Sequence, residues 1–459
     1  MNDIKEQRQT GKSFRKEETS RKVLGIWKPV SNRSEILNLM AEQEKGRIQE
    51  LLPLRHERML QSPFAFFRGT AILQAKDLSD SPGTPFYVQA CGDAHISNFG
   101  MFASPERRMV FDINDFDETL PAPFECDVKR LLASVEICGR DRGFSREQRE
   151  AAVEECARTY RESMRRFSEM GSLDVWYAHL DIDSVLKEQS DFLEPKNVKD
   201  IKKAVEKAQM KNSGRAMKKL MEETDGVFRI KSDPPIVVPL RDLVDADKER
   251  YDFRHNIREA LKLYQESLPV ERRGIIDSYE PLEMARKVVG VGSVGTRSWI
   301  LVLTGAGKDD PLVLQIKEAG PSALERYFGK SRFSEQGRRV VEGQRAIQTV
   351  GDILLGWITF SSEDGINGDY YVRQLWDSKG SFDLEKISCE ELRGLSSACA
   401  WTLAHAHAKT GNRHMIAGYL GKGEDFEKAM VGYARAYADQ NEADFEVCRR
   451  AWKKQAGDL

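Results

Sequence analysis

Carboxylates and one asparagine gather in two neighbouring loops early in the chain. Asp93 and Asn98 lie in the segment Cys-Gly-Asp-Ala-His-Ile-Ser-Asn, which follows an apolar, strand-like run at residues 85–90. A second strand-like run, residues 108–111, leads into a carboxylate cluster made of Asp112, Asp115 and Asp117. Asp and Asn also favour ordinary turns, because their side chains bond to their own backbone. The pattern is therefore typical either of a turn or of a site for acid–base and metal chemistry.

Phosphoryl transfer is the chemistry that suits this set of side chains. It needs a carboxylate that accepts the proton of a hydroxyl group, and oxygen ligands that hold Mg²⁺ on nucleotide phosphates. We expect Asp93 to be the catalytic base and Asn98 and Asp112 to be the metal ligands. Asp115 and Asp117 are the reserve metal ligands, because the register of the cluster is open to a slip of three residues.

A glycine-rich segment at residues 288–303 contains the pattern G-x-G-x-x-G at Gly290, Gly292 and Gly295. A dinucleotide-binding turn would need a helix directly after these glycines. The following residues, 299–303, are instead aromatic, β-branched or aliphatic, which is typical of a strand. We therefore favour a glycine-rich hairpin whose backbone N–H groups approach nucleotide phosphates closely.

A lysine on the next strand fits the hairpin. Residues 311–319 alternate between two faces, and Lys317 lies on the same face as Val313. This lysine would pair with the α and β phosphates and be held by a helix carboxylate. Glu342 is our first choice for that carboxylate and Glu335 the second. The alternatives are a solvent-facing Lys317 and a Glu342 that pairs with a neighbouring arginine.

Helical spacing of apolar residues predicts the remaining large elements. We expect Ser145 to cap the helix at residues 146–169, and Asn32 or Ser34 to cap the helix at residues 31–60. The predicted helices cover residues 31–60, 127–134, 146–169, 183–222, 246–265, 336–350, 392–410 and 425–454. A strand at residues 370–376 should lead into a connector at 377–381. Two histidines in the helix at 392–410, His405 and His407, point to different faces and favour packing contacts over a metal site.

Several segments leave two interpretations open. Residues 1–24 are mostly polar, and we expect them to be loosely attached. Arg68 is expected to form a buried ion pair, with a phosphate contact as the alternative. The lysine-rich segment 183–222 is expected to be a solvated helix face, with a surface for an acidic or phosphorylated substrate as the alternative. Pro281 marks a junction between two parts of the chain.

Composition limits the classes of function. The chain has 459 residues, 40% hydrophobic and 31% charged, with a formal net charge of −2. This balance indicates neither a nucleic-acid partner nor a membrane surface. The seven cysteines include no Cys-x-x-Cys pair, which favours reduced thiols and a cytoplasmic location. No run of apolar residues is long enough to span a membrane. The sequence contains no motif that indicates the oligomeric state or the acceptor substrate.

These motifs carry two resemblances. The loop of Asp93 and Asn98, followed by Asp112, resembles the catalytic and metal-binding loops of aminoglycoside phosphotransferases and other protein-kinase-like enzymes. The glycine segment, Lys317 and Glu342 look like their small-lobe parts. Residues 63–413 resemble the bacterial domain-of-unknown-function 2252 family in four stretches: Phe-Phe-Arg-Gly, Cys-Gly-Asp-Ala-His-Ile-Ser-Asn-Phe-Gly, Phe-Asp-Ile-Asn-Asp-Phe-Asp-Glu and Tyr-Val-Arg-Gln-Leu. Cys91 departs from the phosphotransferases, which usually have His there.

The resemblance implies an α+β, two-lobed, protein-kinase-like fold that is circularly permuted. The catalytic loop precedes the glycine-rich small lobe, whereas kinase-like chains have the opposite order. Permutation is tolerated when the new ends fall at exposed connections. The expected parts are a polar tail and helix (1–60), a large-lobe part with the catalytic and metal loops (61–280), the small lobe (281–376), and a connector with further large-lobe helices (377–459).

The implied function is ATP- and Mg-dependent transfer of a phosphoryl group to a hydroxyl of an unidentified small molecule or protein. Two alternatives stay open. The same fold supports transfer of AMP to a protein if ATP binds in the reverse orientation. A nucleotide-binding regulatory protein without turnover would keep the binding residues while making no product.

Overall fold

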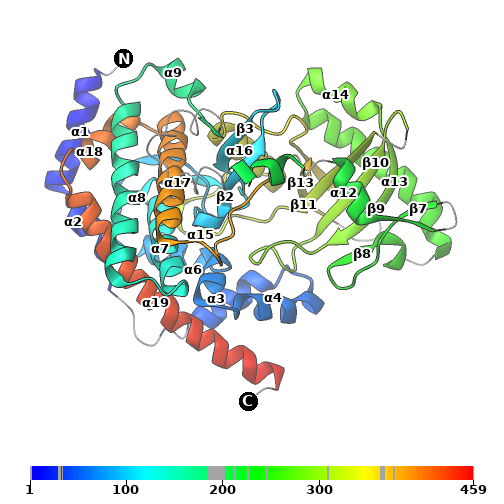
Figure 1. Cartoon of the computed structure of the whole chain (residues 1–459), viewed down its shortest axis with the longest axis horizontal. Helices are drawn as coiled ribbons and strands as arrows, with labels where there is room; N and C mark the ends of the chain where they lie inside the picture. The colour runs from blue at the N-terminus through cyan, green and yellow to red at the C-terminus, as the bar shows by residue number, and fades with distance from the viewer. Residues whose placement is uncertain are drawn as a thin grey trace.

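The computed structural model places a mainly helical region beside a six-stranded sheet (Figure 1). The helical region consists of residues 3–182 and 388–457, and the sheet region of residues 213–375. The mixture of helices and strands confirms the α+β class. The structure describes residues 3–28, 33, 35–182, 202–203, 205–210, 213–224, 227–243, 246–307, 310–361, 367–375 and 378–457. The predicted caps Asn32 and Ser34, and residues 183–201 of the lysine-rich segment 183–222, lie outside the described residues.

Four long helices form the main core of the helical region. They are α7 (Glu125–Asp141), α8 (Arg146–Phe167), α17 (Cys389–Thr410) and α19 (Asp425–Ala456). Ser145 caps α8 as predicted, because its hydroxyl oxygen accepts a hydrogen bond from the backbone N–H of Gln148 and the Gln148 side chain bonds back. Ser388 and Glu391 form the same capping box at α17. Local sequence therefore determines where these two core helices begin.

The N-terminal segment is ordered, so the prediction of a loosely attached tail was wrong. Its helices are α1 (Ile4–Glu17) and α2 (Arg21–Leu24), and α1 packs along α18 (Arg413–Leu420). A Cβ atom on Gly11 would lie 2.0 Å from the carbonyl oxygen of Met415, so the two backbones touch directly. Arg15 donates a hydrogen bond of 2.8 Å to the carbonyl oxygen of Tyr419. Glycine and arginine–backbone contacts hold α1 in place without an apolar stripe.

Short helices connect this framework to the first small sheets. The predicted helix at residues 31–60 is divided into several elements because Pro53 opens a new helix. The helices before the first strand are α3 (Glu35–Glu44), η1 (Gln49–Leu51), α4 (Leu52–Met59), α5 (Pro63–Arg68) and α6 (Ala71–Ser79). A short helix, α9 (Ser172–Tyr177), follows α8.

Two small antiparallel sheets carry the carboxylate-rich loops. Their strands are β1 (Tyr87–Ala90), β2 (Phe99–Ala103), β3 (Met109–Ile113), β4 (Leu120–Pro123) and β5 (Leu180–Asp181). β1 pairs with β4, while β3 pairs with both β2 and β5. The loop of Asp93 lies between β1 and β2, and the loop of Asp115 lies between β3 and β4. Each loop therefore runs from one small sheet to the other, the first from β1 to β2 and the second from β3 to β4.

The six-stranded sheet is antiparallel throughout, in the order β12-β13-β11-β10-β9-β8. Its strands are β8 (Val237–Pro239), β9 (Glu280–Lys287), β10 (Ser298–Thr304), β11 (Pro311–Glu318), β12 (Gly356–Ser361) and β13 (Asn367–Gln374). Leu312 and Leu314 pack on one face of β11 and Val313 on the other, which confirms the predicted alternation. A strand therefore follows the glycine segment, which excludes the dinucleotide-binding turn.

Helices cover both faces of this sheet (Figure 1). α13 and α14 pack on the face of Leu312, and α12 packs on the opposite face. The sheet region also contains η3 (Leu240–Asp242), α12 (Ser213–Leu220), α13 (Ala246–Ser267), α14 (Val270–Asp277), α15 (Glu325–Phe328), α16 (Gln336–Ile347), β6 (Met221–Thr224) and β7 (Val227–Ile230). α16 contacts β12, β13 and α17, and its residues Val340 and Val341 belong to the core of the helical region. α16 therefore joins the two regions.

The junction predicted at Pro281 does not separate two parts of the fold. Pro281 lies within β9, opposite Leu303 of β10. β8 precedes this position and pairs with β9 in the same sheet. The sheet region therefore begins well before residue 281, because α12, α13 and β8 all pack with the strands that follow it.

Candidate active site

The loop after β1 is held by a buried carboxylate. Asp127 accepts hydrogen bonds from the backbone N–H groups of Cys91 (2.8 Å) and Gly92 (2.9 Å). Nε2 of His407 lies 3.2 Å from the same carboxylate, and its Nδ1 lies 2.8 Å from the hydroxyl of Tyr160. Gly92 has a φ of +84°, and a Cβ there would lie 2.0 Å from a backbone oxygen. Cys91 thus contributes its backbone, and Asp127 with His407 supports the loop.

Asp93 follows this rigid turn and faces a cluster of cations. Its Oδ1 accepts a hydrogen bond of 2.7 Å from Nε of Arg130, which also donates to the carbonyl oxygen of Phe67 at 2.6 Å. Burial raises the pKa of Asp93 to about 6, although the charge of Arg130 opposes the rise. The Asp93 side chain keeps 18% of its surface exposed. A carboxylate with a pKa near neutrality that solvent can reach is suited to act as a general base.

Asn98 lies beside Asp93 and next to the second loop. Its Nδ2 donates a hydrogen bond of 2.8 Å to the backbone oxygen of Asp93. Its own backbone oxygen accepts a hydrogen bond of 2.8 Å from the N–H of Asn114. This pairing places Asp115 near Asn98, and Asp115 raises the pKa of Asp93 through its charge. Asn98 and Asp115 therefore both act on Asp93, and their role as metal ligands stays a prediction.

Asp112 does not join this group. It is 6% exposed on β3, and its Oδ1 accepts a hydrogen bond of 2.8 Å from the N–H of Ile113. Burial raises its pKa to about 7, and the nearest opposing charge is Lys409 on α17. Among the described residues, none of its contacts involves Asp93, Asn98 or Asp115. The strand ends at Ile113, so the loop that follows brings the reserve ligand Asp115 to the site instead.

Lys317 on β11 forms an ion pair with Asp117, and its side chain is only 3% exposed. The hydroxyl of Tyr371 donates a hydrogen bond of 2.8 Å to the other oxygen of Asp117. Burial would lower the pKa of Lys317, but the charges of Asp115 and Asp117 raise it. Burial would raise the pKa of Asp117, but Lys317 lowers it. Both groups are therefore charged at neutral pH.

The predicted partner of Lys317 was wrong. Glu342 lies on α16, where its Oε1 is 3.2 Å from Arg345. Glu335 is the N-cap residue of the same helix, and its Oε2 accepts a hydrogen bond of 3.0 Å from the hydroxyl of Ser334. Arg339 faces the Asp117 loop instead and donates to the backbone oxygens of Thr119 (2.7 Å) and Asp117 (2.8 Å). One turn later, Gly343 packs against Thr119 without a side chain. Glu342 therefore pairs with a neighbouring arginine, which was the alternative interpretation of this residue.

The glycine segment forms the tip of the hairpin between β9 and β10, as predicted. Gly290 and Gly295 adopt φ angles of +64° and +88°, which favour glycine over other residues. A Cβ on Gly292 would lie 3.2 Å from the backbone oxygen of Arg68 at the end of α5. The loop therefore approaches the Asp93 site through Arg68, the residue whose charge acts on Asp93.

Three arginines from α4 and from the connection before η1 hold the carbonyl groups of this loop. Arg47 donates to Val294 (2.6 Å), Arg55 to Gly292 (2.7 Å) and Arg58 to Gly290 (2.6 Å). The N–H of Ile48 donates to the carbonyl oxygen of Gly295 at 2.8 Å. The backbone N–H groups of Gly292, Ser293 and Gly295 donate no hydrogen bond within the described part of the chain. Such N–H groups are suited to bind an anion.

The sequence pattern did not single out these arginines. Their partners lie 247, 237 and 232 residues further along the chain. The spacing of nearby residues in the sequence cannot predict contacts between positions so far apart. A surplus of arginine over acidic residues between positions 47 and 68 was the one available signal, and ordinary surface helices show the same surplus.

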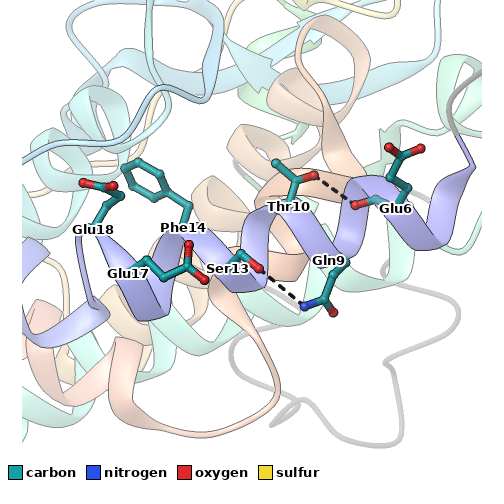
Figure 2. Close-up of a pocket in the computed structure, with 7 residues that line it drawn as sticks. All are labelled: Glu6, Gln9, Thr10, Ser13, Phe14, Glu17 and Glu18. Atoms are coloured by element: carbon teal, nitrogen blue, oxygen red, sulfur yellow. Dashed lines mark hydrogen bonds between the residues drawn. The ribbon is translucent and has the colours of Figure 1, made fainter.

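Other features of the surface do not mark the site. In the residues that the structure describes, no three His, Cys, Asp or Glu side chains come together as a metal-binding group. A shallow hollow on α1 is lined by polar and acidic side chains around Phe14, and none of the residues discussed above borders it (Figure 2). Within the described ranges, no helix is both long and apolar enough to cross a membrane.

The comparisons with known proteins identify a family. A family model described as "Uncharacterized protein conserved in bacteria (DUF2252)" matches residues 47–451. The chain belongs to this family. No curated protein and no solved structure matches the chain. The matched range begins at Arg47, so it includes the arginines that hold the glycine loop as well as both carboxylate loops.

Proposed function

We propose that this member of the DUF2252 family is an ATP- and Mg²⁺-dependent phosphotransferase that acts on a hydroxyl group of an unidentified acceptor. The ion pair between Lys317 and Asp117 carries the proposal, because it joins the glycine-hairpin sheet to the loops of Asp93 and Asp115. The glycine hairpin would bind phosphate together with Lys317, while Asp93 would act as the base and the loop of Asp115 would supply metal ligands. These are the parts that phosphoryl transfer requires.

The residues present fit a nucleotide with its metal ion. The N–H groups of Gly292, Ser293 and Gly295 and the ammonium group of Lys317 suit phosphate oxygens. The oxygens of Asn98 and Asp115 suit Mg²⁺, with Asp117 in reserve. Mg²⁺ in such sites uses one or two carboxylates plus substrate phosphates. The absence of a three-residue metal cluster among the described residues is therefore compatible with this proposal.

The chain's own residues would position and activate the acceptor. Bound Mg·ATP supplies the transferable phosphoryl group, so that a bond forms from the acceptor oxygen to phosphorus and the bond to the leaving oxygen of ADP breaks. Asp93 would take the proton of the acceptor hydroxyl at a carboxylate oxygen. Arg130 holds Oδ1 of Asp93, which would leave Oδ2 to contact the acceptor. Asp127 and His407 keep the backbone of this loop fixed.

The contacts of α17 support a permuted, kinase-like arrangement. The backbone N–H of Gln89, on the strand that leads to Asp93, donates a hydrogen bond of 3.2 Å to the hydroxyl of Thr410 at the end of α17. A Cβ on Gly411 would lie 2.6 Å from Val88. α17 thus ends where the strand of the catalytic loop runs. In an unpermuted chain a helix here would lead directly into that loop.

Mass spectrometry after incubation with Mg·ATP tests the proposal. The full-length protein is incubated with pools of hydroxyl-bearing small molecules and proteins, and acceptors are screened for added phosphate or added AMP. We expect added phosphate, which Asp93→Asn should form far more slowly than the wild type. Added AMP would replace the proposal by nucleotidyl transfer. Nucleotide binding without product across a wide screen would favour a regulatory nucleotide-binding protein.

A further inference from the structure

Arg68 occupies the position between the glycine loop and Asp93. It is the last residue of α5, and its backbone oxygen abuts Gly292. The preceding residue, Phe67, is joined to Asp93 by Arg130, which hydrogen-bonds to both. The guanidinium group of Arg68 acts electrostatically on Asp93 and on His95. Arg68 therefore lies under the hairpin tip and at the proposed base.

Arg68 has no partner of its own. It forms no hydrogen bond and no ion pair with any residue that the structure describes, and its buried Nε is unsatisfied. The ion pair expected for Arg68 is made by Arg130 instead, which stacks on Phe67 and bonds to Asp93. A half-buried cation without a partner is unfavourable unless a ligand supplies the missing anion. The side chain is thus available to an incoming anionic group.

The arrangement of charges indicates which anionic group would fit. Lys317 lies with Asp115 and Asp117, beside the strand of the hairpin. Arg68 acts electrostatically on Asp93, the carboxylate that would receive the acceptor proton. Phosphates held along the glycine loop would have their inner groups at Lys317 and their outermost group at Arg68. Arginine matches phosphate oxygens in a two-pronged geometry and is a common stabiliser of charge on a transferring phosphoryl group.

We propose that Arg68 binds the terminal phosphate of the nucleoside triphosphate and so distinguishes it from the diphosphate. This inference rests on the proposed function. It assigns Arg68 a contact that neither Lys317 nor the glycine loop would make, because those groups hold the phosphates that ATP and ADP share. Neutralising Asp93 does not explain Arg68, since Arg130 already pairs with that carboxylate.

The experiment is calorimetry of the full-length protein with two Mg²⁺-bound probes, ADP and an ATP analogue that cannot be hydrolysed. For Arg68→Gln we expect about tenfold weaker binding of the analogue, the loss of a hydrogen bond to a charged group. Binding of ADP should stay within about twofold. Arg68→Lys should restore part of the affinity for the analogue, because it keeps the charge but loses the planar fork.

Two variants make the result interpretable. Arg142→Gln is the matched control, because Arg142 is also half-buried with an unsatisfied Nε but lies at the C-terminal end of α7. That end is roughly 18 Å along the helix from Arg130, so Arg142→Gln should bind both probes like the wild type. Lys317→Ala should weaken both probes. Thermal melting without nucleotide checks that each variant is folded.

The possible failures differ. If Arg68→Gln weakens ADP and the analogue equally, or neither, while Lys317→Ala weakens both, the role of Arg68 is wrong and the proposed function stands. If the wild type binds neither probe at millimolar concentration, the proposed function fails and the inference fails with it.

Discussion

Lys317 and Asp117 form an ion pair although 200 residues separate them in the chain. The pair joins β11 of the sheet to the loop after β3, and Tyr371 on β13 completes it with a hydrogen bond to the same carboxylate. Because the contact crosses between the two regions of the fold, it fixes the glycine hairpin relative to Asp93. Phosphates at this site would compete with Asp117 for the lysine ammonium group.

Replacing Lys317 with alanine should therefore weaken nucleotide binding. Loss of a charge-assisted contact corresponds to roughly tenfold to hundredfold in affinity. Titration calorimetry with Mg·ADP measures the effect, and circular dichroism checks the fold. Glu342→Gln is the control on the neighbouring helix, because Glu342 pairs with Arg345 and not with Lys317. Unchanged affinity for the lysine variant, or an equal loss for both variants, would contradict the assignment.

The two loop aspartates should behave differently. Asp115→Asn removes a negative charge beside Asp93 and Asn98, so Mg²⁺-dependent binding of the ATP analogue should weaken by about tenfold or more. Asp112→Asn should leave that binding unchanged, because the carboxylate of Asp112 faces Lys409. Calorimetry at several Mg²⁺ concentrations separates the two variants. A Mg²⁺-dependent loss of affinity in the Asp112 variant alone would show that Asp112 is the metal ligand, as first expected from the sequence.

Sequence patterns predicted the parts of the site whose structure depends on residues close together in the chain. Alternation along residues 311–319 placed Lys317 on the correct face, and the apolar run after Gly295 indicated a hairpin. The choice between Asp112 and Asp115 depends on where β3 ends, which spacing alone does not determine. The partner of Lys317 depends on the way α16 packs, since Gly343 brings the helix so close to Thr119 that Arg339 faces the loop.

The N-terminal helices show why long-range contacts escape such patterns. α1 docks through Gly11 and through arginine side chains that bond to backbone oxygens of α18. Arg55 joins the glycine loop to α5 in the same way. Contacts of this kind do not require a periodic pattern of apolar residues in the sequence. The polar composition of residues 1–24 therefore predicted a loosely attached tail. Arginine bonded to distant backbone oxygens is the recurring device in this fold.

Arg55 should be important for stability. It is fully buried and donates hydrogen bonds to the carbonyl oxygens of Gly292 (2.7 Å) and Gly69 (3.1 Å) and to Glu44 (3.3 Å). Arg55→Met would leave Glu44 short of a partner inside the protein, so we expect a loss of about 3–5 kcal/mol in unfolding free energy. Urea denaturation measures it. Arg58→Met, at a half-buried position on the same helix, should change stability by about 0.5 kcal/mol or less.

Transfer should depend on pH through Asp93. Its pKa is raised to about 6 by burial, and only the ionised carboxylate accepts a proton. The rate should therefore fall as the pH decreases through about 6, by about tenfold per pH unit below it. Burial also raises the pKa of Glu118 to about 6, so Glu118→Gln is the necessary control. Loss of the acidic limb in the Glu118 variant would assign the titration to Glu118 instead.

The last prediction separates a catalyst from a nucleotide-binding protein. Asp93 would contact the acceptor hydroxyl and not the metal ion, so Asp93→Asn should keep its affinity for the ATP analogue near that of the wild type. Transfer should slow by roughly 10²–10⁴-fold, the usual contribution of a positioned general base. Its residual rate should be independent of pH around 6, because the titrating group is gone. A variant that transfers as fast as the wild type would exclude Asp93 as the base.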